Sequence, residues 1–312
     1  MTHPFCSRLA ASAHGVIAGT GVVGEIYVFL PVDKKRWGRR EFNESWASAP
    51  ELEAIRRARK AGVTVRLYDP PREPALQAIL LYPSPSPSSR ATLGLQDLLT
   101  ELGHRRWSVD DTGRARLALC TQGTRDRCCA KWGFALYREA LALHDSGDFA
   151  FEPIECSHLG GDRFAATGIV FPSGSMYGHL DQLPLPDLAS AEREQRVLPN
   201  HYRGRVFESP LTQVVRAGLA QDGFPVTTVS DVAIEGPTDG AAPLSVIAAG
   251  RRYEVTLSRR SFEFYGDCRA AAQSRVSRES RLAYSQAKLV EPLSGTVTAE
   301  LAPPPSKPAE SA

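Results

Sequence analysis

The alternation of hydrophobic and polar residues along the chain predicts three folding units. The first unit, residues 21–95, contains apolar runs typical of strands at Glu25–Pro31, Val63–Tyr68 and Leu76–Tyr82. Between the first two runs, Ala49–Ala61 has apolar residues at helical spacing. The pattern therefore predicts an N-terminal α/β unit with the order β-α-β-β, which ends in a loop rich in proline and serine.

The second unit, residues 112–205, has a related pattern. Arg114–Cys120 and Phe149–Glu155 are typical of strands, and Ala130–His144 between them is typical of an amphipathic helix. Two further apolar runs flank a Pro-Ser-Gly turn at residues 172–174 and predict a hairpin. A strand, a helix, a strand and then a hairpin is the order of a thioredoxin-like core. The expected fold class is therefore α/β, with a mixed sheet and flanking helices.

The remaining segments are shorter or less regular. Residues 208–295 predict a small C-terminal α+β unit, with a helix at Leu211–Ala220 followed by strands near Val226–Ile234, Leu244–Ala249 and Arg252–Leu257. Residues 1–20 are expected to form a flexible leader, and the proline-rich residues 296–312 a disordered tail.

Composition excludes several classes of function. A net charge of +2 is too small to indicate nucleic-acid binding, and no window approaches the roughly 20 apolar residues of a membrane helix. The start of the chain does not resemble a secretory signal, so we expect a cytoplasmic protein with reduced thiols. Gly19–Gly24 matches the dinucleotide fingerprint in its letters, but it precedes a strand instead of joining a strand to a helix. Nucleotide binding is therefore not expected.

Four of the six cysteines lie in two short segments, Cys120–Cys129 (CTQGTRDRCC) and Glu155–Ala165 (ECSHLGGDRFA). Such a density of soft ligands predicts a metal or iron–sulfur site. Cys120 ends a predicted strand, where open α/β sheets place their ligands. Cys128 and Cys129 begin the next helix, where the helix dipole favours the thiolate. Neighbours on a helix point about 100° apart, so only one of this pair is expected to face the site.

The second segment supplies a histidine and a tight turn. Cys156 and His158 are two residues apart at the end of a predicted strand, so we expect both side chains on one face. Gly160 and Gly161 allow a turn with positive φ. We expect this turn and the adjacent Arg163 to contact a bound cofactor, because backbone N–H groups can stabilise bridging sulfides.

These segments resemble the sucrase/ferredoxin-like family of thioredoxin-fold proteins. The matching pieces are CTQGTRDRCC, SHLGGDRFA, the turn PSGSMYG and HYRGR at His201–Arg205. Members of the family studied as ferredoxins carry a 2Fe–2S cluster bound by two cysteines and two histidines. The resemblance implies that Cys120, Cys129 and His158 are ligands, with Cys128 as the alternative to Cys129.

The chain departs from the family pattern at Asp162, where the bishistidinyl members have their second histidine. The fourth ligand is then either Cys156 or Asp162. Iron–sulfur chemistry prefers thiolate to carboxylate, and this preference favours Cys156. Asp162 would in that case support the turn.

The expected function is that of an electron carrier, not an enzyme, which passes single electrons to a redox protein partner. The alternative is a structural zinc site in a thioredoxin-like domain. Thiol–disulfide exchange ranks lower because the C-x-x-C motif is absent, and sucrose cleavage ranks low because the loops lack an evident carboxylate pair.

Cys6, Cys128 and Cys268 are expected to pack in the core. The basic run Lys34–Arg40 is interpreted as solvated surface, with docking of an acidic partner as the alternative.

Overall fold

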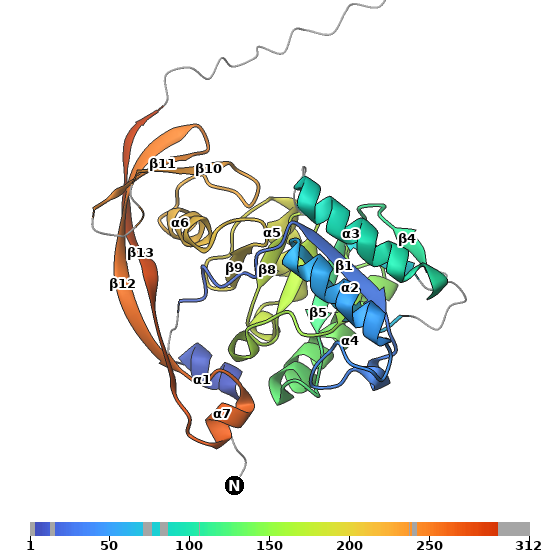
Figure 1. Cartoon of the computed structure of the whole chain (residues 1–312). Helices are drawn as coiled ribbons and strands as arrows, with labels where there is room; N and C mark the ends of the chain where they lie inside the picture. Colours follow the sequence, from blue (N-terminus) through green and yellow to red (C-terminus); the bar gives the residue numbers. More distant parts are fainter. Residues whose placement is uncertain are drawn as a thin grey trace, which may run out of the picture.

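The computed structural model describes residues 4–12, 16–70, 77–81, 87–105, 107–236, 238 and 242–292. A mixed nine-stranded sheet carries the main body, and a four-stranded antiparallel sheet stands apart from it (Figure 1). The predicted α/β class is therefore confirmed. Within the described residues, no helix is long and apolar enough to cross a bilayer.

The large sheet has the strand order β4-β3-β1-β2-β6-β5-β7-β8-β9. Its strands are β1 (Ile26–Pro31), β2 (Val63–Tyr68), β3 (Gln77–Leu81), β4 (Ser108–Asp110), β5 (Arg116–Cys120), β6 (Glu152–Cys156), β7 (Gly168–Phe171), β8 (Ser175–Tyr177) and β9 (Tyr202–Arg205). The small sheet contains β10 (Val232–Glu235), β11 (Leu244–Ala248), β12 (Arg251–Phe264) and β13 (Ser277–Pro292). The α-helices are α1 (Cys6–Ser12), α2 (Ala49–Lys60), α3 (Ser89–Glu101), α4 (Phe134–Asp145), α5 (Leu185–Arg193), α6 (Pro210–Gln221) and α7 (Cys268–Ala272).

The large sheet consists of two halves, in which strands and helices follow one another in a similar order. In the first half, α2 connects the parallel strands β1 and β2, and β3 lies antiparallel to β1. In the second half, α4 connects the parallel strands β5 and β6, and β7 and β8 continue the sheet in antiparallel fashion, as in a thioredoxin-like core. The antiparallel pairing of Tyr68 with Cys156 joins the halves. The units expected at residues 21–95 and 112–205 therefore share one sheet.

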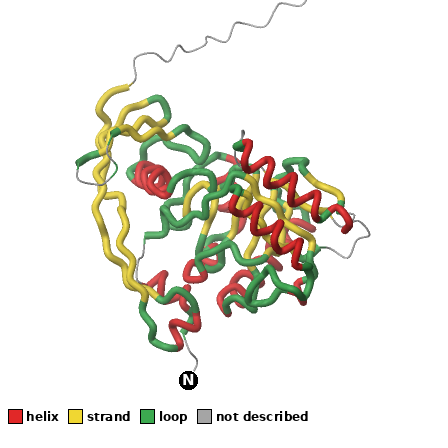
Figure 2. The backbone as a smooth tube through the Cα atoms, viewed as in Figure 1, coloured by secondary structure: helices red, strands yellow, loops and turns green. Residues whose placement is uncertain are grey.

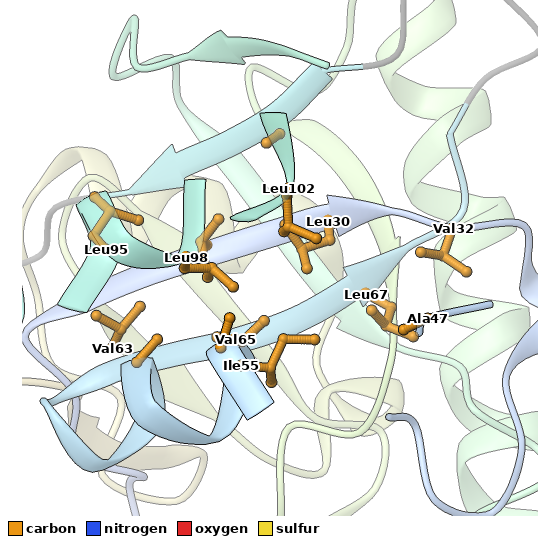
Figure 3. Close-up of a cluster of buried hydrophobic side chains, with 14 of the residues drawn as sticks. Leu30, Val32, Ala47, Ile55, Val63, Val65, Leu67, Leu95, Leu98 and Leu102 are labelled. Carbon is orange, nitrogen blue, oxygen red and sulfur yellow. The ribbon is translucent and has the colours of Figure 1, made fainter. Parts of the chain in front are cut away.

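The first half is stabilised by an apolar layer between its strands and helices α2 and α3. Alternate strand residues such as Leu30, Val65 and Leu67 point toward Ile55 of α2 and Leu98 of α3 (Figure 3). The hydrophobic spacing of α2 predicts this packing correctly. Helix α3, which sequence analysis does not identify, follows the proline-serine run.

The sequence does not reveal α3, because the helix starts within the proline-serine segment that predicts a loop. Ser88 caps the helix, because its hydroxyl accepts a hydrogen bond from the Ala91 N–H at 3.2 Å. The expected loop at Pro83–Ser89 therefore ends in a helix start, and residues 83–86 of it lie outside the described residues. The strand expected at Leu76–Tyr82 is β3, with its two outermost residues outside the described part.

A second apolar core lies between the two halves. Strand residues opposite to those of the first layer, Tyr27 and Phe29, contact Phe171 of β7 with ring centroids 5.8 and 6.3 Å apart. The same core contains Cys120 and Cys156. The ends of β5 and β6 are thus buried between the halves, and this burial shields any group bound there from water.

The small sheet is extended by a long hairpin of β12 and β13, which pair from Arg251 and Pro292 to Phe264 and Ser277. Its far end carries α7, which lies beside α1 at the bottom of the molecule (Figures 1 and 2). Sequence analysis anticipates only the first part of β12, because charged residues follow there. Part of the leader expected at residues 1–20 is instead helical, since α1 has a buried start at Cys6. The tail expected at residues 296–312 lies outside the described residues.

Candidate metal centre

Three donor side chains meet where β5, β6 and the segment before α4 come together. Cys120 is the last residue of β5, and Cys129 opens the π-helical turn Cys129–Gly133 that leads into α4. His158 follows the end of β6. The two sulfur atoms and a ring nitrogen of His158 all lie within 4.8 Å of one another. The structure therefore brings together the three residues that the family resemblance implies.

Local sequence explains this convergence. A Cβ atom on Gly133 would lie 2.0 Å from the carbonyl oxygen of Cys120, so only glycine lets the π-helical turn pack against the strand end. Gln122 joins the two loops, because its amide oxygen accepts a hydrogen bond from the His158 backbone N–H at 2.9 Å. Its amide nitrogen donates to the carbonyl of Gly38 at 2.7 Å. Gln122 is not predicted from the sequence, since nothing in the spacing marks its two partners.

Electrostatics favour an ionised sulfur at this place. Hydrogen bonds from Cys129 and then His158 hold the pKa of the Cys120 thiol well below its ordinary value, despite burial. Burial opposes protonation of His158, but the interaction with Cys120 outweighs it and raises the imidazole pKa. The Cys120 sulfur lies 3.9 Å from Nδ1 of His158. A thiolate is the form of cysteine that binds metals, so the Cys120 side chain is prepared for that role.

Asp162 lies against two of the three donors. One carboxylate oxygen is 3.2 Å from Nδ1 of His158 and 3.7 Å from the sulfur of Cys129. The other oxygen forms an ion pair with Arg125 at 3.4 Å. The side chain is only 4% exposed, and this burial raises the pKa of the carboxyl group. Asp162 therefore contacts two of the three donors, although its carboxylate is not among the atoms that all lie within 4.8 Å of one another.

Cys156 is placed differently. It pairs in register with Cys120 across β5 and β6, yet its sulfur does not belong to the group of donors that meet within 4.8 Å. Strand β6 ends at Cys156, so the strand alternation that would align it with His158 does not continue. Burial raises the pKa of the Cys156 thiol well above its ordinary value. The carboxylate of Asp162 is not one of the donors that meet within 4.8 Å either, so the choice between Cys156 and Asp162 as the fourth ligand stays a prediction. What distinguishes Asp162 is its contact with His158 at 3.2 Å and with Cys129 at 3.7 Å.

The Gly-Gly turn is held by a buried arginine. Gly160 and Gly161 have φ values of 86° and 79°, as their sequence predicts. Arg203, from the segment HYRGR, is 2% exposed and donates to the carbonyl oxygens of Gly160 at 2.8 Å and Thr20 at 2.5 Å. Burial lowers the pKa of Arg203 to about 9. Sequence analysis uses HYRGR only as part of a resemblance, and the structure gives its central arginine a role in positioning the turn.

Two other residues expected at the site point elsewhere. Arg163 forms an ion pair with Glu279 of β13 at 3.1 Å, and its guanidinium lies 3.6 Å from the ring centroid of Phe264. It therefore holds the C-terminal hairpin against the body. Cys128 faces away from the three donors, and its sulfur lies 3.2 Å from that of Cys268. The adjacent cysteines thus point to different places, as helical geometry predicts.

The tight packing of the turn gives a stability prediction. Gly161 and Gly223 both have φ of 79°, but a Cβ on Gly161 would lie 2.8 Å from Nη2 of Arg203, whereas one on Gly223 would meet nothing within 4 Å. Gly223→Ala is expected to lower the free energy of unfolding by about 1–2 kcal/mol, the cost of the left-handed backbone. Gly161→Ala adds a steric cost of about 1–3 kcal/mol. Denaturant titration measures both, and equal losses would contradict a role of Arg203 in packing against the turn.

Comparison with known proteins gives one result. The family model described as sucrase/ferredoxin-like matches residues 17–204. The matched range contains the three donors and also Asp162 and Arg203. No curated protein and no solved structure matches the chain.

Proposed function

The chain belongs to the sucrase/ferredoxin-like family, and from this premise we propose that it is a one-electron carrier whose Cys120, Cys129 and His158 bind a 2Fe–2S cluster. The observation that carries the proposal is the convergence of these three donors within 4.8 Å, inside the matched range. A 2Fe–2S cluster bound there would accept and release single electrons.

The donor set suits such a cluster. Thiolate and imidazole are the two ligand types of mixed-ligand 2Fe–2S centres. Both cysteines are buried in the core between the sheet halves, whereas the His158 side chain is 19% exposed. We propose that electrons enter and leave at this imidazole edge. The Gly160–Gly161 turn would supply backbone N–H groups beside the cluster.

We propose Asp162 as the fourth ligand. Its contacts with His158 and Cys129 support this choice, and so does its position four residues after His158. A carboxylate adds a negative charge that an imidazole would not, so it would make the centre harder to reduce than one with two histidines. If Asp162 does not ligate, its ion-pair contact with Nδ1 at 3.2 Å would instead orient the His158 ring.

A structural zinc ion at the same donors is the second candidate. Ligand atoms around tetrahedral zinc lie about 3.8 Å apart, given zinc–sulfur bonds of about 2.3 Å. The 3.9 Å between Cys120 and His158 and the 3.7 Å between Cys129 and Asp162 favour this candidate. The two candidates differ in colour, metal content and redox behaviour.

Analysis of the purified chain, expressed with iron available, tests the proposal. We expect a brown protein with about two iron atoms and two acid-labile sulfides per chain, and a paramagnetic signal after reduction with dithionite. Cys120→Ser should remove the signal, because it removes the ionised ligand. A colourless wild-type protein with zinc at Cys120 and Cys129 would establish the second candidate instead.

A basic surface lies beside the proposed centre. The segment Lys34–Arg36 and its continuation pack on the cysteine loop, where the Thr124 hydroxyl donates to the Trp37 carbonyl at 3.0 Å. Arg36 is exposed, and a groove of 330 Å³ nearby is lined by arginines that include Arg39 and Arg269. We propose that an acidic redox protein docks here, since opposite charge accelerates encounter.

Small oxidants test the charge of this surface. Arg36→Glu is expected to slow oxidation of the dithionite-reduced protein by ferricyanide, an anion, by about 2- to 5-fold at low ionic strength. Arg259→Glu, at an exposed position of β12, is the matched control because it changes the net charge equally. Stopped-flow measurements give both rates. Equal slowing by the two variants would show that only the overall charge matters and would contradict a local docking surface.

A further inference from the structure

A second group of metal-binding side chains lies next to the first and shares no residue with it. Cys6, Asp126, Cys128 and Cys268 are all buried, and their donor atoms lie within 4.8 Å of one another. The three sulfur atoms form a triangle with sides of 3.6, 3.2 and 3.7 Å. All three are free thiols. The interpretation of these cysteines as separate core residues misses this convergence, because they are far apart in the sequence.

The group joins three parts of the chain. Cys6 opens α1, Cys128 precedes the π-helical turn, and Cys268 opens α7 at the end of the long hairpin. Figure 1 shows α1 and α7 side by side at the end of the β12–β13 hairpin, away from β10 and β11. Cys6 and Cys268 lie outside the range that the family model matches. Half of the site therefore comes from segments beyond the matched range.

Asp126 is held in place by the backbone. One carboxylate oxygen accepts from the Cys128 N–H at 2.8 Å, and the other accepts from the Cys268 N–H at 2.6 Å. These bonds fix the carboxylate with an oxygen 4.0 Å from the sulfur of Cys6. Burial raises the pKa of Asp126 to about 6. A nearby cation would favour the ionised carboxylate, and free lone pairs remain to bind it.

Thiol chemistry gives the reason to expect a cation. A disulfide would use two of the three sulfur atoms and leave the third thiol buried beside it. Three thiols packed alone gain little, because sulfur is a weak donor and a weak acceptor. A tetrahedral zinc ion uses all of them, since its sulfur ligands lie about 3.8 Å apart, close to the sides of the observed triangle. Binding would release protons from the thiols, and the zinc charge would offset the resulting thiolates.

We propose that Cys6, Cys128 and Cys268, with Asp126, bind a structural zinc ion that fastens α1 and the tip of the β12–β13 hairpin to the body of the protein. The Ser7 hydroxyl donates to the Cys128 sulfur at 3.2 Å, but Ser7 is not one of the proposed ligands. Ion pairs such as Arg163–Glu279 supplement the attachment of the hairpin. This inference does not depend on the identity of the first centre.

Metal analysis of the full-length chain tests the proposal. Purified wild type should contain about one zinc ion per chain at this site. Cys6→Ser and Cys268→Ser should each lose that zinc, at least 5-fold, and keep the metal of the first centre. Cys120→Ser is the matched control, because it removes a buried cysteine of the other group and should keep this zinc. If the first centre also holds zinc, wild type contains two ions and each variant loses one.

If the serine variants do not fold, the proposal can be tested on wild type by X-ray absorption at the zinc edge. The sample for this measurement contains one zinc ion per chain. We expect a first shell of three sulfur atoms and one oxygen, with zinc–sulfur distances of about 2.3 Å. A shell of oxygen and nitrogen alone would overturn the proposal, as would unchanged zinc in both variants. A disulfide between Cys128 and Cys268 in protein purified under reducing conditions, found by mass spectrometry, would overturn it as well.

Discussion

Cys129→Ser is expected to remove iron and acid-labile sulfide almost completely and to retain zinc, whereas Cys128→Ser is expected to do the reverse. The reason is geometric, because the two neighbouring side chains point into different groups of ligands. The sulfur of Cys129 lies with Cys120 and His158, and that of Cys128 lies with Cys6 and Cys268. Metal analysis and the visible absorption spectrum of the two variants give the result directly.

Ser7→Ala is the control for this pair of variants. It removes the hydrogen bond to the Cys128 sulfur without removing a ligand, so both metals should stay at wild-type levels. Loss of iron and zinc together in Cys128→Ser and in Cys129→Ser would mean that the two groups form one centre. That outcome would contradict the separation of their donor atoms.

Asp162→His is expected to raise the reduction potential of the cluster by on the order of 100 mV, because a neutral imidazole replaces a carboxylate. The variant restores the residue that the family resemblance implies at this position. Its side chain would stand where the carboxylate now contacts His158 at 3.2 Å and Cys129 at 3.7 Å. A redox titration followed by paramagnetic resonance measures the shift.

Cys156→Ser is the counterpart of that variant. If Asp162 is the fourth ligand, this change should keep the cluster and leave its potential within about 30 mV of wild type, since only a buried neutral thiol is replaced. Loss of the cluster in Cys156→Ser, together with an unchanged potential in Asp162→His, would instead identify Cys156 as the ligand. The two variants therefore decide between the alternatives that sequence leaves open.

Local patterns predict much of the fold and where the first group of donors lies. The strands at β1, β2 and β5 follow from β-branched and apolar runs, and α2 and α4 follow from helical spacing. Cys120, the pair Cys128 and Cys129, and His158 stand out because each lies beside the end of such an element. The resemblance selects Cys129 from the pair. The resemblance adds the idea that they act together, which spacing alone does not supply.

Long-range contacts are the part that sequence does not predict. Arg203 binds Gly160 across 43 residues, and Cys6 lies beside Cys268 across 262 residues. No short pattern records such pairings, because each partner is embedded in an ordinary local sequence. The choice between Cys156 and Asp162 as the fourth ligand stays a prediction, because strand alternation cannot be applied beyond Cys156, where β6 ends.

The ring of Phe171 contacts both Tyr27 and Phe29 across the two sheet halves. A fragment cut down to the cysteine-bearing half would leave these apolar surfaces bare to solvent and prone to aggregate. Anyone who wishes to build a minimal redox module from this protein must therefore keep the N-terminal strands, even though they donate no ligand.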